Sequence, residues 1–231
     1  NMAIAKWLEQ RRWGETFDVL LIVNPTEDLG GAELEGKIIR EVLAQFSSVR
    51  VTQRKGPEAT RDVLLRDFRS GKYDAIHYAG HALFDPDDLS RGGIRCAAHQ
   101  VITGSDLAGL GNLPALVFFN ACESARLRGK RDVPIGQRLS ASVSFAESFL
   151  RGGIANFIGT YWPVQDESAK VFARTFYGRA IRGDGIGHAL LEARQTVREI
   201  PSKDWADYIH YGNASFQLKI RHQPLETQEN D

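Results

Sequence analysis

LVFFNACES, residues 116–124, is the segment on which the predicted fold depends most. Four apolar residues followed by small and polar ones are typical of a buried strand that leaves a sheet and exposes its last residues. A second stretch, YDAIHYAGH at residues 73–81, has the same pattern. If the two strands are parallel neighbours, Cys122 and His81 lie at the same edge of the sheet, which is where open α/β sheets place their sites. A thiol beside an imidazole is a nucleophile beside its general base.

Apolar runs alternate with amphipathic periodicities along most of the chain, which predicts strands that alternate with helices. Further strands are predicted over residues 17–23, 49–54, 155–162 and 208–220, and helices over residues 30–46, 57–70, 145–151, 166–181 and 185–200. A short hairpin is predicted over residues 93–101, and a short helix follows Thr103. This order predicts an α/β fold, a three-layer α/β/α sandwich around a mainly parallel sheet of about six strands.

The chain of 231 residues is most simply one domain with short appendages. We expect the domain to cover residues 15–221. Residues 1–14 have helical spacing and predict a packing helix, and residues 222–231 form a polar tail that we expect to be disordered. Residues 125–142 are rich in Arg, Lys and Gly, and we expect a mobile loop there.

Composition argues against several classes of partner and cofactor. Lys and Arg total 29 and Asp and Glu total 29, so neither a nucleic acid nor an anionic membrane is expected as a partner. No apolar run approaches the roughly 18 residues of a membrane span, and two cysteines in such a chain fit a reducing compartment, so we expect a cytoplasmic protein with Cys122 as a free thiol. No nucleotide fingerprint follows the first predicted strand and no Cys/His cluster has metal spacing, so we expect no cofactor and no metal.

Several motifs resemble, in order, the successive motifs of the CHAT domain. They are YDAIHYAGH (73–81), NACES (120–124), FAESFLRGGI (145–154) and IGTYWPVQD (158–166), followed by WADYIHYGNASF (205–216). CHAT domains belong to the caspase-like cysteine peptidases, with caspases, separase, legumain and gingipains. The resemblance covers residues 17 to 220. It implies a peptidase fold in which Cys122 is the nucleophile and His81 is the general base and acid.

The resemblance also implies an oxyanion hole and a specificity pocket. The backbone N–H groups of Cys122 and Ala82 would bind the oxyanion, and Ala82 stands where the family usually has glycine. Asp166 is at a position similar to the acid that holds a basic side chain in separase-like relatives, so cleavage after Arg or Lys is expected. From the sequence, Asp166 is equally well placed to cap the helix that begins there, and Glu123 could line the pocket instead. The basic loop 125–142 is then a possible self-cleavage site.

A second histidine, His77, lies four residues before His81 on the same face of the predicted strand, and we predict a structural role for it. The function expected from the resemblance is a cysteine endopeptidase, a bacterial or archaeal hydrolase acting on protein or peptide substrates. A partner protein or an attached helical-repeat sensor region could activate it. The alternative is a catalytically silent CHAT-like module that serves protein interaction or signalling.

Overall fold

The structure is a computed structural model that describes residues 16–83, 93–107, 114–120, 146–147, 149–150, 154–160 and 164–218. The predicted helix at 1–14, the loop 125–142 and the tail 222–231 lie outside the described residues, as do Cys122 and Glu123.

A six-stranded sheet with the strand order β2-β1-β3-β7-β8-β9 forms the centre of the fold. All neighbouring strands are parallel except β9, which runs antiparallel to β8. The mainly parallel sheet predicted from the sequence is therefore confirmed. The strands are β1 (Phe17–Val23), β2 (Val49–Lys55), β3 (Ala75–Ala79), β7 (Leu116–Asn120), β8 (Asn156–Thr160) and β9 (Tyr208–Gly212). Every residue of β3 and β7 is buried, as expected of strands that helices cover on both faces.

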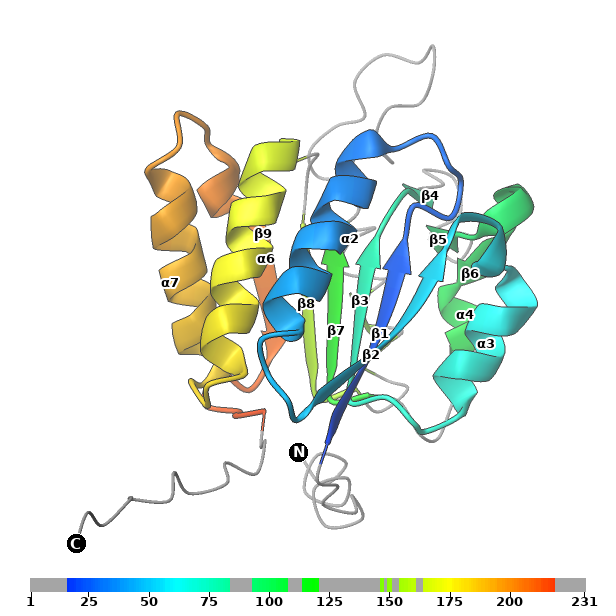
Figure 1. The fold of residues 1–231 in the computed structure, drawn as a ribbon, viewed down its shortest axis with the longest axis horizontal. Coiled ribbons are helices and arrows are strands. Elements are labelled where there is room, and N and C mark those ends of the chain that lie inside the picture. The colour runs from blue at the N-terminus through cyan, green and yellow to red at the C-terminus, as the bar shows by residue number, and fades with distance from the viewer. Residues whose placement is uncertain are drawn as a thin grey trace, which may run out of the picture.

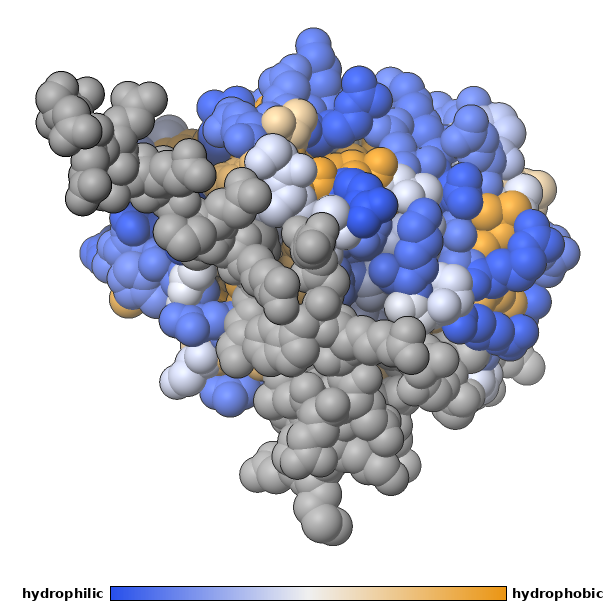
Figure 2. Space-filling model, turned by 60° about the horizontal axis from the view of Figure 1, so that its bottom comes forward, coloured by the Kyte–Doolittle hydropathy of each residue, from blue (hydrophilic) through white to orange (hydrophobic). Residues whose placement is uncertain are grey.

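Helices cover both faces of this sheet, which makes the three layers (Figure 1). On one face lie α2 (Gly30–Leu43), α6 (Asp166–Ala180) and α7 (Ile186–Arg198), and on the other α3 (Arg61–Arg69) with the short α4 (Gly104–Leu107). Two separate apolar clusters fill the spaces between the layers. The face seen in Figure 2 is mostly hydrophilic where the described residues form it, and its hydrophobic surface is limited to small separate areas.

A second, three-stranded antiparallel sheet stands beside the first, with the order β4-β5-β6. The strands β5 (Gly93–Arg95) and β6 (Val101–Thr103) are the predicted hairpin, joined through the 3-10 turn η3 (Ala97–His99). The two-residue strand β4 (Ala82–Leu83) was not predicted, because it is too short to show a period of two. It directly follows His81, so the second sheet is attached to the predicted site.

Two predicted boundaries differ from the observed ones by four residues or more. The helix predicted from residue 57 begins at Arg61, because Gly56 adopts a positive φ of 50° and starts the 3-10 turn η1 (Gly56–Glu58) instead. Thr60 is the true N-cap, and its side chain accepts a hydrogen bond from the N–H of Val63. The last strand ends at Gly212 rather than at residue 220. A 3-10 turn, η4 (Asp204–Ala206), precedes that strand.

Candidate active site

The two strands that carry the predicted dyad are direct neighbours. β3 and β7 pair in parallel, with Ala79 opposite Asn120 as the last residue of each. His81 lies two residues past the end of β3. Cys122 lies two residues past the end of β7 in sequence, outside the described residues. Neighbouring strands in a sheet are about 4.8 Å apart. The segments that carry His81 and Cys122 therefore leave the sheet from paired strand ends.

The backbone of His81 is held from two sides. Its carbonyl oxygen accepts the N–H of Arg95 at 2.9 Å and the hydroxyl of Tyr78 at 2.5 Å. Tyr78 is fully buried, and burial raises the pKa of its phenol well above the ordinary value of 10. Its hydroxyl reaches past Gly80, where a Cβ atom would lie 2.6 Å from the Tyr78 oxygen. The sequence YAGH is therefore one unit, in which a tyrosine anchors the histidine and a glycine makes room for the tyrosine.

The imidazole of His81 has an acidic partner that the sequence analysis missed. Its Nε2 atom lies 3.0 Å from Oδ1 of Asp28. Burial raises the pKa of Asp28, but a hydrogen bond from Thr26 and the charge of His81 outweigh it, so that the pKa falls below 3.8. Asp28 is therefore a carboxylate that can only accept a hydrogen bond, and Nε2 of His81 donates.

Asp28 reaches the site because of how the loop after β1 folds. β1 is the other parallel neighbour of β3, with Val23 opposite Ala79, so its loop leaves the sheet at the same edge. Asn24 and Glu27 have positive φ angles of 43° and 61°, and Oδ1 of Asn24 accepts the N–H of Leu29 at 3.1 Å. The acidic string NPTED at this strand end was the available signal.

The backbone of Ala82 is oriented by the second sheet. Ala82 pairs with Ile94, and the next hydrogen bond of the ladder runs from the N–H of Arg95 to the carbonyl of His81. In an antiparallel ladder this makes Ala82–Ile94 a pair without its own hydrogen bonds. The N–H of Ala82 therefore points away from β5.

Asp166 lies in the first turn of α6, but it does not cap that helix. The N-cap is Gln165, whose side chain makes no capping hydrogen bond. Asp166 is therefore not the N-cap, although it lies in the first turn, where the partial positive charge of the helix end favours an acid. Its carboxylate packs against Gly31 in the first turn of α2, where a Cβ atom would lie 2.1 Å from Oδ1 of Asp166. Figure 1 shows the first turns of α2 and α6 at the end of the sheet where the parallel strands end, so Asp166 and His81 share that edge.

His77 is part of a polar cluster inside the core. Its Nε2 atom lies 2.9 Å from Oε1 of Glu35 in α2, and its Nδ1 atom lies 3.0 Å from the hydroxyl of Tyr177 in α6. The ring stacks on Phe118 with centroids 4.7 Å apart. Asn120, the last residue of β7, donates its side-chain N–H to the same Glu35 oxygen at 3.0 Å. Both ring nitrogens of the buried His77 thus face protein partners.

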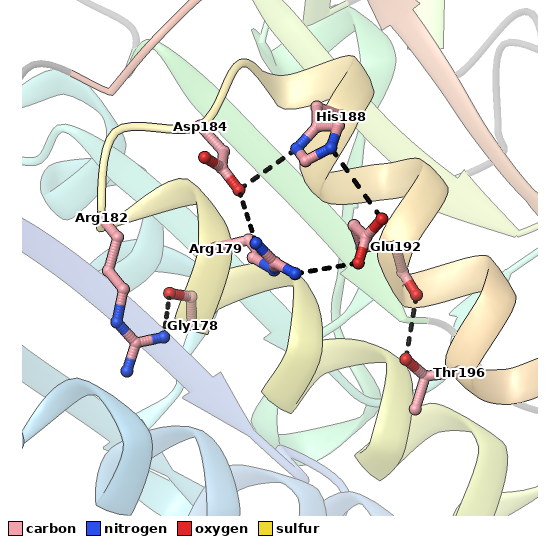
Figure 3. Close-up of polar contacts among 7 residues, drawn as sticks. All are labelled: Gly178, Arg179, Arg182, Asp184, His188, Glu192 and Thr196. Atoms are coloured by element: carbon pink, nitrogen blue, oxygen red, sulfur yellow. Dashed lines mark hydrogen bonds and ion pairs between the residues drawn. The ribbon is translucent and has the colours of Figure 1, made fainter.

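Two other histidines are accounted for by local contacts. His188 is half exposed between Asp184 and Glu192, with Arg179 contacting both acids, and these ion pairs join α6 to α7 (Figure 3). Figure 1 places that connection at the end of the sheet opposite to His81. The ring of His210 contacts Oδ1 of Asn156 at 2.9 Å, and burial lowers its pKa below 6.5.

The other cysteine, Cys96, is a buried free thiol at the end of β5. Burial raises its pKa to about 12, so it stays protonated and is not a nucleophile at neutral pH. Within the described residues, no three His, Cys, Asp or Glu side chains are grouped so that they could hold a metal ion. Nor does any described helix have the length and apolar character needed to cross a membrane.

The family model of the CHAT domain matches residues 8–213. The chain belongs to the CHAT domain family. A search of curated protein sequences found no match. Among solved structures, this CHAT domain is similar to the Arg-specific cysteine proteinase gingipain R, with a TM-score of 0.62 and 14% identity over 89% of this chain and 48% of that one.

A complex of the pro- and mature domains of Porphyromonas gingivalis RgpB gives a TM-score of 0.62 and 14% identity, over 94% of this chain and 53% of that one. The Saccharomyces cerevisiae separase–securin complex gives a TM-score of 0.55 and 16% identity, over 91% of the CHAT domain and 13% of the other chain. The chain thus spans about an eighth of the separase chain and half of the gingipain chain. At these identities the likeness shows the fold, which is that of caspase-like cysteine peptidases.

Proposed function

We propose that this CHAT domain is a cysteine endopeptidase that cleaves proteins after Arg or Lys. One observation carries the proposal. His81 stands two residues beyond β3 with its Nε2 atom on Asp28, and Cys122 follows the paired end of β7 by the same number of residues. A cysteine peptidase site needs a thiol and an imidazole that a third group orients. Here a carboxylate orients the imidazole, and the thiol follows the end of the neighbouring strand by two residues.

The contact of His81 with Asp28 supports different roles for its two nitrogens. Since Nε2 donates to Asp28, Nδ1 is the nitrogen that would act on the thiol. It accepts the proton of Cys122 as the sulfur attacks the scissile carbonyl, and it returns that proton to the leaving amine when the C–N bond breaks. Water then hydrolyses the thioester, with His81 again accepting a proton. Asp28 is a positioning residue, because it holds the ring and stabilises its charged form without touching the substrate.

The N–H of Ala82 supports an oxyanion hole. It is directed away from β5 and belongs to the residue after the base, and the N–H of Cys122 would be the second donor. Two donors on the developing oxyanion are typical of acyl transfer sites and contribute a large part of the rate.

Asp166 is the proposed partner of the basic side chain at the cleaved residue. It is exposed in the first turn of α6, at the end of the sheet where the parallel strands end, and Lys170 of the same helix pairs with Glu167 instead. A carboxylate in that setting selects Arg or Lys by direct pairing. Glu123 remains the alternative residue for this role.

The experiment that tests the proposal is a panel of fluorogenic peptides that differ only in the cleaved residue. We expect turnover of Arg and Lys peptides, its loss in Cys122→Ala and His81→Ala, and a weakened preference in Asp166→Asn. Turnover that survives Cys122→Ala would contradict the assignment of the nucleophile. Silence of the whole panel, together with a Cys122 that does not react with a peptide-based thiol trap, would favour a non-catalytic interaction module.

Regulation by another protein is the second part of the proposal. Separase was solved with securin, and RgpB was solved with its pro-domain. By analogy, a partner or an attached sensor region would control this site, and adding it to the panel should switch turnover on or off.

The free thiol of Cys96 fits a reducing compartment such as the cytoplasm.

A further inference from the structure

Helix α2 begins with two glycines whose surroundings differ. A Cβ atom at Gly31 would lie 2.1, 2.2 and 2.3 Å from Oδ1, Cγ and Oδ2 of Asp166. A Cβ atom at Gly30 would have nothing within 4 Å. Neither glycine has a positive φ, so an alanine suits the backbone at both positions. The carboxylate of Asp166 therefore occupies the place where a side chain at position 31 would stand.

The ends of two helices favour this location of the carboxylate. α2 has 14 residues and α6 has 15, and neither N-cap residue, Leu29 or Gln165, makes a capping hydrogen bond with its side chain. The N-terminus of a helix carries a partial positive charge that attracts a carboxylate within the first turn. Asp166 lies in the first turn of its own helix and against the first turn of the other.

We propose that Gly31 is a specificity-determining residue, because its missing side chain lets Asp166 lie where it can pair with a basic residue of the substrate. This inference rests on the proposed function and adds to it a second position that controls the pocket. Any side chain at position 31 moves the Asp166 carboxylate away from α2 while leaving its charge in the protein.

The displacement leaves the fold intact. Asp166 is exposed, and the atoms that a new methyl group would meet are the end of its side chain, which can rotate away. Alanine also favours a helix more than glycine does. The melting temperature of Gly31→Ala is thus expected to equal or exceed that of the parent, so unfolding cannot explain a loss of selectivity.

The test compares Gly31→Ala with the matched control Gly30→Ala and with Asp166→Asn. The readout is the ratio of kcat/KM for a peptide cleaved after Arg to that for the same peptide with citrulline, the neutral analogue of Arg. We expect this ratio to fall about 10- to 100-fold in Gly31→Ala, the range of a lost charge-assisted hydrogen bond, mainly through a higher KM for Arg. Gly30→Ala should keep the parental ratio, and Gly31→Ala combined with Asp166→Asn should lose no more than Asp166→Asn alone.

Binding of agmatine, measured by NMR titration of the same variants, gives a readout that needs no turnover. Gly31→Ala should bind it about tenfold more weakly than Gly30→Ala does. Equal ratios and equal agmatine binding in the two alanine variants would overturn the inference, while a loss in Asp166→Asn would leave the proposed function standing. If Asp166→Asn also matches the parent, the Asp166 pocket itself is refuted.

Discussion

Replacement of His77 by phenylalanine should destabilise the fold strongly. The new ring can keep the stacking on Phe118, but it removes both nitrogens that face Glu35 and Tyr177. A buried polar group that loses its hydrogen-bond partner costs about 1–3 kcal/mol, and this substitution takes a partner from two such groups, so the loss should be about 2–6 kcal/mol. In a chain of this size we expect the melting temperature to fall by roughly 4–24 °C.

The assay is urea unfolding followed by circular dichroism at pH 7, with His188→Phe as the matched control. His188 is 53% exposed, so the same substitution there should change the free energy of unfolding by less than about 0.5 kcal/mol. A double-mutant cycle of His77→Phe with Glu35→Gln should show a coupling energy of at least about 1 kcal/mol. A loss below about 1 kcal/mol in His77→Phe, with no coupling, would contradict the inference that this buried cluster holds α2 and α6 to β3 and β7.

Three further outcomes are expected. Gly36→Ala should lower the free energy of unfolding by about 1–3 kcal/mol in urea, because its Cβ would lie 2.5 Å from Cγ2 of Val23; an unchanged midpoint would contradict the tight packing of α2 on β1. Iodoacetamide at pH 8 should modify Cys122 and spare Cys96, whose pKa is raised to about 12, and peptide mass spectrometry that finds Cys96 labelled in the folded protein would argue against its burial. Asp28→Asn should lower kcat about tenfold, the effect of one charge-assisted hydrogen bond. Because the pKa of Asp28 lies below 3.8, its contribution is present at pH 7 and is lost only as the pH falls through that lowered value; a kcat of Asp28→Asn equal to that of the parent at pH 7 would contradict the assignment.

The apolar runs made the strands of the main sheet predictable, since β3 and β7 are buried on both faces and read as continuous hydrophobic stretches. Because β3 and β7 are neighbours, His81 follows the end of β3 beside the end of β7, as the sequence predicted. The start of α3 was not predictable in the same way, because the positive φ of Gly56 leaves no trace in hydrophobic periodicity. The strand β4 owes its conformation to its pairing with β5, and a two-residue segment carries no pattern of its own.

The parts of the site that sequence reasoning missed depend on loop geometry and on packing between helices. Asp28 meets His81 because Asn24 turns the loop after β1 back over the sheet edge, and neither the turn nor its direction follows from residue types alone. The sequence pattern of an acid at the start of a helix is the same whether the acid caps that helix or faces another helix. Only the contact of Asp166 with Gly31 distinguishes the two.

Because Tyr78 and Gly80 are in contact, the residue that is tolerated at one position depends on the residue at the other. A methyl group at position 80 would lie 2.6 Å from the tyrosine oxygen and 2.8 Å from Cζ, so loss of the hydroxyl alone would not make room for it. A larger residue at 80 therefore requires a shorter side chain at 78, and that change gives up the hydrogen bond to the carbonyl of His81. Among homologous sequences these two positions should covary, with glycine accompanying tyrosine. If position 80 changes before position 78, the intermediate sequence loses the hydrogen bond from Tyr78 to the carbonyl of His81.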